Sequence, residues 1–170
     1  IHEALKDFLA AKADYDRAIA LKGTNVYEVL YKRALLNYLE LGEKDAALAD
    51  LTAVIKGSPK SNTLASFIRG LLYTENNQLE GANADFESVI KLDSTYTEVY
   101  FYWAEVKLKL EQYDEALRLI TIYLKDADTL SELDLANAYQ LIGKVHLQQK
   151  DFAAALQAFD QSLANDDEMG

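Results

Sequence analysis

The pattern of apolar and polar positions between residues 28 and 59 defines a unit from which most of the chain is built. Its first half has apolar residues at the i, i+3, i+4 and i+7 positions of one helical face: Tyr31, Ala34, Leu35 and Tyr38. Its second half has another apolar series: Ala47, Leu51, Val54 and Ile55. Gly42 separates the two series, and Gly57 and Pro59 end the second. The pattern predicts two helices joined by a short turn.

The same two-part pattern returns three more times, and its second half alone stands at the front of the chain. The predicted units are a lone helix and four hairpins, at residues 1–23, 28–59, 63–94, 97–128 and 129–167. An alanine recurs in each second helix, with successive spacings of 36, 35, 34 and 39 residues: Ala11, Ala47, Ala82, Ala116 and Ala155. Because a fixed period indicates stacked repeats, we expect a single domain of about nine helices.

Each copy has a recurring order of residue types. The first helix has the order aromatic, apolar, small and aromatic, and Tyr100, Trp103 and Ala104 occupy the first three of these positions in the third copy. The second helix has the motif Ala-x3-aromatic and ends at a helix breaker. In four copies over nearly the whole chain, this motif resembles the tetratricopeptide repeat (TPR). The resemblance implies an all-α fold, an α-α solenoid in which TPR hairpins form a right-handed superhelix.

Four residues depart from the family pattern. Leu35 stands where the first full copy needs a small residue, and Arg69 stands where a leucine is usually buried. Lys107 and His146 occupy positions that prefer tyrosine. We expect loose packing or local bending at these positions, without loss of the fold.

The longest spacing falls between the third and fourth hairpins. Two pairs there have the spacing of a capping box: Thr129 with Glu132, and Ser131 with Asp134. We therefore expect the first helix of the fourth hairpin to start early and to project from the stack.

Charge and composition exclude several classes of partner and chemistry. The net charge is −11, which opposes binding to nucleic acid or to an anionic membrane. The sequence has no cysteine and no apolar run long enough to span a bilayer. The compartment stays open, with a cytoplasmic location favoured. The sequence begins in mid-repeat without a signal peptide, so we expect a trimmed chain that naturally continues in both directions; the alternative is that its ends meet partners.

No constellation of catalytic residues emerges. His2 and His146 are far apart and lack the spacing of a metal site, and no phosphate-binding glycine motif or nucleophile elbow is present. We expect His146 to be a core or half-buried residue, and the acidic cluster at 166–168 to be a solvated tail. The sequence predicts no enzyme, no cofactor and no metal.

A second face of each first helix, about 120° from the packing face, is the candidate peptide-binding groove. In the first two full copies it is apolar and aromatic: Val29, Lys32, Leu36, Leu39, Leu64, Phe67, Leu71 and Thr74. In the last two it is mixed: Glu98, Phe101, Glu105, Leu108, Asn137, Gln140, Lys144 and Leu147. The resemblance implies a concave groove on this side, and an apolar face of this size is rarely left in water. The alternative is that the protein's own chain covers it.

These observations favour a non-catalytic scaffold that binds an apolar or amphipathic, and basic, protein segment. The TPR clamp for acidic chaperone tails would require basic and amide residues at five positions, where the chain has Lys32, Leu36, Ile68, Glu98 and Tyr102. Only Lys32 fits, so we do not expect an acidic ligand. Two alternatives stay open: self-assembly into homo-oligomers through uncapped terminal helices, and a client-binding co-chaperone or regulatory region of a larger protein.

Overall fold

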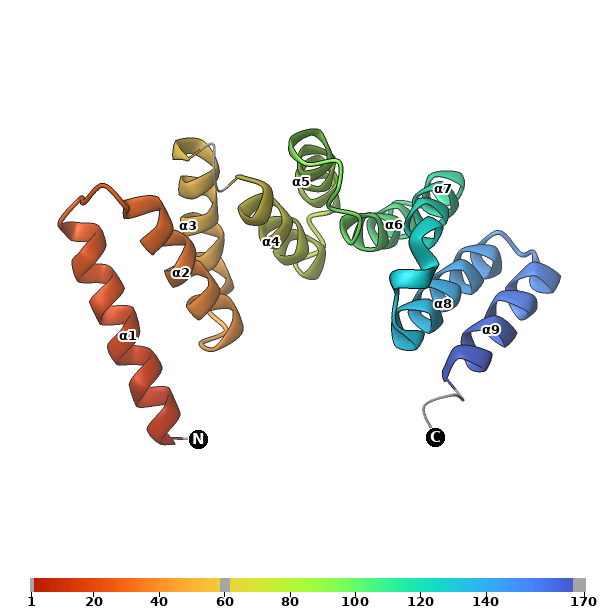
Figure 1. Ribbon diagram of the computed structural model, residues 1–170, viewed down its shortest axis with the longest axis horizontal. Coiled ribbons are helices and arrows are strands. Elements are labelled where there is room, and N and C mark those ends of the chain that lie inside the picture. Colours follow the sequence, from red (N-terminus) through yellow and green to blue (C-terminus); the bar gives the residue numbers. More distant parts are fainter. Residues whose placement is uncertain (1, 59–61, 167–170) are drawn as a thin grey trace. The chain divides into compact units, whose positions relative to one another are not determined.

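The computed structural model describes residues 2–58 and 62–166, which contain nine α-helices and no strand (Figure 1). The helices are α1 (His2–Ala20), α2 (Val26–Leu39), α3 (Lys44–Gly57), α4 (Asn62–Glu75), α5 (Leu79–Leu92), α6 (Val99–Lys109), α7 (Tyr113–Tyr123), α8 (Glu132–Gln148) and α9 (Phe152–Asp166). A 3₁₀ helix, η2 (Leu124–Thr129), separates α7 from α8. The all-α solenoid class is therefore confirmed. The predictions for Pro59, for the side chain of His2 and for the acidic cluster at 166–168 lie outside the described residues.

The helices group into two compact units, Ile1–Asp93 and Ser94–Gly170. In the first unit, each helix from α1 to α5 packs on the next one along the chain. In the second unit, α6 packs on α7, α7 on α8 and α8 on α9, while η2 lies against α7 and α8. Each unit is thus a short stack in which no helix buries its apolar face alone.

Left-handed backbone residues close the turns between paired helices. Three hairpins have a three-residue turn that contains one such residue, namely Asn77, Glu111 or Lys150, with φ of 56°, 58° and 63°. The turn between α2 and α3 is one residue longer and uses Gly42, with φ of 68°. This conformation ends a helix without a steric penalty only when the residue is glycine.

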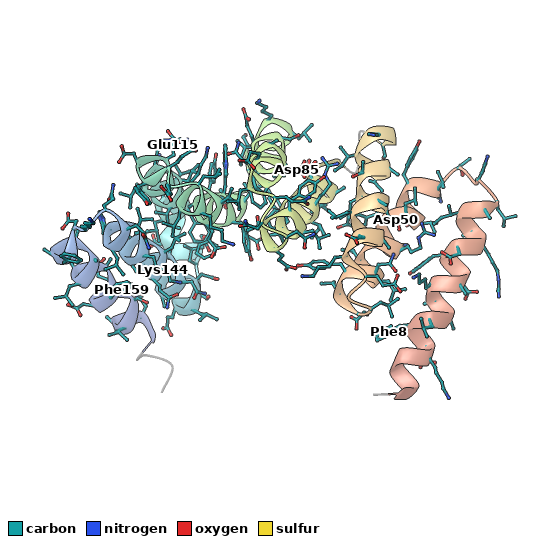
Figure 2. All side chains as sticks on the ribbon, turned by 180° about the vertical axis from the view of Figure 1, so that it is seen from behind. Phe8, Asp50, Asp85, Glu115, Lys144 and Phe159 are labelled. Atoms are coloured by element: carbon teal, nitrogen blue, oxygen red, sulfur yellow. The ribbon has the colours of Figure 1, made fainter. Side chains whose placement is uncertain are left out.

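The extra turn residue shifts the register of α2 by one position from the prediction. Arg33 donates from Nε and Nη2 to both carboxylate oxygens of Asp50, at 2.8 and 2.6 Å. Arg69 makes the same pair of bonds to Asp85, at 2.8 and 2.7 Å (Figure 2 labels Asp50 on α3 and Asp85 on α5). Arg33 therefore corresponds to Arg69, and the next residue, Ala34, corresponds to Gly70.

Ala34 is fully buried, whereas Leu35 is partly exposed. The prediction that Leu35 replaces the small residue is therefore wrong, because the longer turn at Gly42 moves the small position to Ala34. With this correction, all four hairpins carry a small residue at the contact between their helices: Ala34, Gly70, Ala104 and Gly143.

The residue that faces each small position compensates for its volume. A Cβ built on Gly70 would lie 2.6 Å from Cε1 of Phe86, and one on Gly143 would lie 2.5 Å from Cε1 of Phe159. The corresponding partners of Ala34 and Ala104 are aliphatic: Leu51 and Ile120, each in the same core cluster as its alanine. Glycine thus admits a phenylalanine ring where alanine admits a smaller side chain, which keeps the core close-packed.

The long spacing before the fourth hairpin contains a folded insertion. Ser131 is the N-cap of α8: its hydroxyl accepts from the Asp134 N–H at 3.1 Å, and the Asp134 carboxylate accepts from the Ser131 N–H at 3.3 Å. This confirms the capping box at Ser131, and not at Thr129, where η2 ends. The early start is confirmed by the length of α8, 17 residues. The sequence did not predict η2, which fills the interval from α7.

Candidate functional site

The corrected register changes which α2 residues belong to the predicted groove. Val29 and Leu36 correspond to Ala65 and Leu72 on α4, which are fully buried, whereas Val29 and Leu36 are themselves partly exposed. Val29 also lines a hollow beside the turn between α1 and α2, together with Leu21. The place of Val29 and Leu36 in a partner-binding groove therefore stays a prediction.

Phe67, by contrast, is buried and unavailable as a surface residue. It is 6% exposed, and its ring centroid lies 6.1 Å from that of Phe86 at a tilt of 49°. Phe67 therefore belongs to the aromatic core around Gly70. The prediction that it lines an open groove was wrong because an aromatic residue beside a glycine contact packs inward to fill the available volume.

Four of the predicted positions, together with Leu35 and Ile68, which were not predicted there, form what we call the first-helix surface of the first unit. Its members alternate at helical spacing along two helices: Lys32, Leu35 and Leu39 on α2, and Leu64, Ile68 and Leu71 on α4. Leu39 is 64% exposed and Leu64 is 48% exposed. The Tyr38 hydroxyl of α2 donates to Glu75 of α4 at 2.6 Å and joins these two helices directly. The first-helix surface thus exposes Leu39 and Leu64, whereas its other apolar members are only partly exposed.

In the second unit, the predicted groove residues lie on α6 and α8. Phe101, Glu105 and Leu108 are partly exposed, and Lys144 is exposed, with Nζ donating to Gln140 at 2.8 Å. Burial raises the pKa of Glu105, against the opposing influence of Lys109 and Lys144. This half-buried carboxylate makes no hydrogen bond or ion pair shorter than 4 Å with another described residue.

Next to Phe101 lies a pocket of about 240 Å³ that the sequence did not reveal. Its lining comes from α6 and the segment before it, from α7, and from the start of α8: Thr97, Glu98, Phe101, Tyr102, Tyr123, Leu130, Asp134 and Asn137. The Phe101 ring stands edge-on to Tyr102 at 5.4 Å and tilted to Tyr123 at 5.6 Å. We call this cavity the aromatic pocket.

The aromatic pocket is electrostatically negative. Burial raises the pKa of Tyr102 and of Tyr123, and the nearby carboxylates of Glu98 and Asp134 raise both further. Neither carboxylate has an ion-pair partner among the residues that the structure describes. Two features of the sequence could have suggested this pocket: the insertion before α8, and acidic residues next to aromatic ones. Neither feature shows that residues of α6 and α8 line the same cavity, which only the folded structure reveals.

Sequence comparison identifies the family. The family profile described as tetratricopeptide repeat matches residues 32–96 and 103–169, more than half of the chain. The chain belongs to the tetratricopeptide repeat family. A search of curated protein sequences gave no match. Within the described helices, none is both long and apolar enough to cross a membrane.

Several solved TPR-like structures resemble this chain. A crystal structure of MamA superposes with a TM-score of 0.82 at 19% identity, over 98% of this chain and 93% of that one. BtubC from P. vanneervenii gives 0.84 at 15% identity, over 99% and 76%. YrrB, described as a TPR protein with an unusual peptide-binding site, gives 0.79 at 17% identity, over 96% and 80%. At these identities the likeness establishes the fold, and the TPR fold suggests a protein–protein interaction scaffold.

Proposed function

We propose that this TPR chain is a non-catalytic scaffold that binds an apolar or amphipathic segment of a partner protein along the first helices of its hairpins. The observation that carries the proposal is the first-helix surface, where Leu39 and Leu64 are about half exposed or more. Apolar side chains gathered on one accessible face gain free energy when a partner covers them. The segment is basic as well, because a net charge of −11 attracts basic partners and speeds their encounter.

The proposed binding positions are those of the first-helix surface together with Phe101, Glu105, Leu108 and Lys144 of the second unit. YrrB, a protein of the same fold that is described as having an unusual peptide-binding site, supports the proposal. Glu98, the N-cap residue of α6, and Glu105 within α6 argue against an acidic ligand.

Binding of a labelled helical peptide of leucine and lysine, measured by fluorescence anisotropy, tests the first-helix surface. Leu39→Gln and Leu64→Gln each remove an apolar contact, and we expect each to weaken binding about tenfold, which corresponds to about 1.4 kcal/mol. Leu92→Gln is the matched control, because Leu92 is 52% exposed but lies on the second helix α5. A peptide with serine in place of leucine tests the apolar requirement.

Equal affinity of wild type, both groove variants and the Leu92 control for the leucine peptide would refute the proposed surface. Circular dichroism of all variants verifies that helical content is unchanged, which the exposure of the three leucines leads us to expect.

A second observation favours self-association as another candidate function. Three apolar residues on one face of α9 are exposed by 67%, 63% and 59%: Phe152, Leu156 and Leu163. A second copy that packs on this face would bury them. Sedimentation velocity over a range of concentrations should then show an oligomer that Leu156→Glu dissociates, whereas a monomer at all concentrations would dismiss this candidate.

A further inference from the structure

The aromatic pocket is built by the insertion that makes the fourth hairpin longer than the others. Leu130 lies between η2 and α8, and Asp134 lies in the first turn of α8. Tyr123, at the end of α7, is 7% exposed and forms part of the wall, while Thr97, Glu98 and Asn137 are exposed. The pocket therefore has a closed aromatic wall and a polar, accessible rim.

The volume of the pocket suits one side chain of a partner better than a free metabolite. Small-molecule sites usually enclose about 300–1,000 Å³, and the aromatic pocket encloses about 240 Å³. A long side chain entering from a bound segment would displace water from this space.

The chemistry of the lining favours a positive charge. Aromatic ring faces attract cations within about 6 Å, and Phe101, Tyr102 and Tyr123 supply three rings. Glu98 and Asp134 add two carboxylates. One oxygen of Asp134, Oδ2, accepts from the Ser131 hydroxyl at 2.6 Å, whereas no described residue donates to Oδ1. The N-terminus of α8 has a partial positive charge that would oppose a cation, but Asp134 in the first turn offsets it.

Several other acidic residues of this protein form ion pairs with basic side chains. Asp50 and Asp85 bind arginines, and Glu75 binds Lys44 at 2.7 Å. Glu98 and Asp134 have no ion-pair partner among the described residues, and both line the aromatic pocket. Their charges are therefore available to a ligand.

We propose that the aromatic pocket receives a lysine or arginine side chain of the bound segment, held between the rings and the carboxylates of Glu98 and Asp134. This inference rests on the proposed scaffold function and adds the residue type that the partner must present. It assigns the recognition of positive charge to the second unit.

A titration with single-residue probes tests the pocket without relying on the first-helix surface. The probes are N-acetyl-arginine methylamide and its neutral isostere N-acetyl-citrulline methylamide, and the readout is ¹⁵N NMR of the whole chain. We expect the arginine probe to shift the amide signals of Thr97 and Asn137 saturably, with at least a fivefold weaker response to the citrulline probe. Glu98→Gln should weaken the arginine response at least fivefold, and Asp160→Asn, which removes an exposed charge from α9, should leave it unchanged.

Four results would overturn the inference: equal responses to the two probes, no saturable shift, an equal loss in the Asp160→Asn control, or stronger shifts with calcium chloride, which would indicate a metal site. A second comparison separates this inference from the scaffold proposal. The leucine and lysine peptide is tested beside a copy with norleucine at every lysine. If the norleucine copy binds as well and Leu64→Gln still weakens it, the scaffold stands and the cation pocket fails. If the arginine probe binds the pocket but Leu64→Gln has no effect on the peptide, the pocket stands and the first-helix surface fails.

Discussion

At equivalent positions of their hairpins, the first unit has ion pairs and the second unit has apolar residues. In the first unit, the residue before each small position is an arginine paired with an aspartate of the second helix: Arg33 with Asp50, and Arg69 with Asp85. In the second unit, the corresponding positions hold Trp103 with Leu119, and Ile142 with Ala158. A TPR hairpin therefore accepts either an ion pair or apolar side chains at this contact.

Each arginine of the first unit also reaches the preceding helix. Arg33 Nη1 donates to Asp16 of α1 at 2.6 Å, and Arg69 Nη1 donates to Thr52 of α3 at 3.0 Å. Hydrogen bonds to the aspartates raise the pKa of both arginines above its usual value. One side chain thus connects a hairpin internally and joins it to its neighbour. A buried pair of this kind fixes register, whereas apolar contacts tolerate small slips.

Breaking one ion pair should produce the largest effect. The side chains of Arg69 and Asp85 are 17% and 7% exposed, so Asp85→Ala leaves a half-buried guanidinium without its carboxylate. We expect the free energy of unfolding to fall by about 3–5 kcal/mol in urea titrations monitored by circular dichroism. Arg69→Ile combined with Asp85→Ala, which copies Ile142 and Ala158, should recover most of this loss.

Asp45→Ala is the matched control, because Asp45 is an exposed carboxylate on α3. A loss for Asp85→Ala of no more than about 1 kcal/mol, as for a surface pair, would show that the first unit does not depend on its ion pairs.

Substitution of the glycine at the helix contact should have an intermediate effect on stability, and the effect should differ between the two units. Phe86 is fully buried and cannot yield to a new Cβ on Gly70, whereas Phe159 is partly exposed and can turn away from one on Gly143. Overpacking costs about 1–3 kcal/mol, and alanine in place of helical glycine returns up to about 1 kcal/mol. Gly70→Ala should therefore destabilise, and Gly143→Ala should be nearly neutral in thermal melts. Phe86→Leu should cost less in the Gly70→Ala background than in wild type; additive costs would disprove the volume compensation.

The smallest expected effect is the pH dependence of stability, which should have opposite signs for Glu75 and Glu105. Hydrogen bonds from Lys44 and Tyr38 lower the pKa of Glu75 in the first unit, whereas burial raises the pKa of Glu105 in the second. The stability from Glu75 is present above the unfolded pKa, near 4.5, and is lost as pH falls through the lower folded value. The contribution of Glu105 is opposite: it is present below 4.5 and lost as pH rises through the raised folded value.

Melting temperatures of Glu75→Gln and Glu105→Gln, measured between pH 3 and pH 8, check these signs. At neutral pH we expect the first substitution to lower and the second to raise the melting temperature. Both differences should shrink under acidic conditions, where the wild-type carboxyls are protonated. A Glu105→Gln variant that melts below wild type at neutral pH would contradict the assignment.

Much of the fold could be predicted from sequence because helical periodicity and repeat spacing are local signals. The helices, the hairpins and the Ser131 capping box needed only residue types at fixed distances. The register of α2 was predicted incorrectly because Leu35 and Ala34 both satisfy the periodicity, and the extra turn residue does not alter it. Arg33 and Asp50 are 17 positions apart, whereas Arg69 and Asp85 are 16 apart. This difference of one indicates the extra turn residue in the first hairpin.

The candidate site was less predictable because it depends on which neighbours cover a face. Phe67 and Leu64 lie on adjacent parts of one helix, yet only the tertiary packing decides that Phe67 is buried and Leu64 is exposed. The aromatic pocket needs residues from three helices and from the segments that precede α6 and α8. Spacing within one helix cannot reveal such a cavity.

The longer turn at Gly42 also shows where these hairpins can change length. One residue inserted within a helix rotates every later side chain by about 100° around the axis. An insertion within α3 before Asp50 would therefore aim its carboxylate away from Arg33, whereas the residue added at the turn leaves both helical faces in phase. The added residue of the first hairpin is thus accommodated at its tip, and the angular alignment of α2 with α3 is kept.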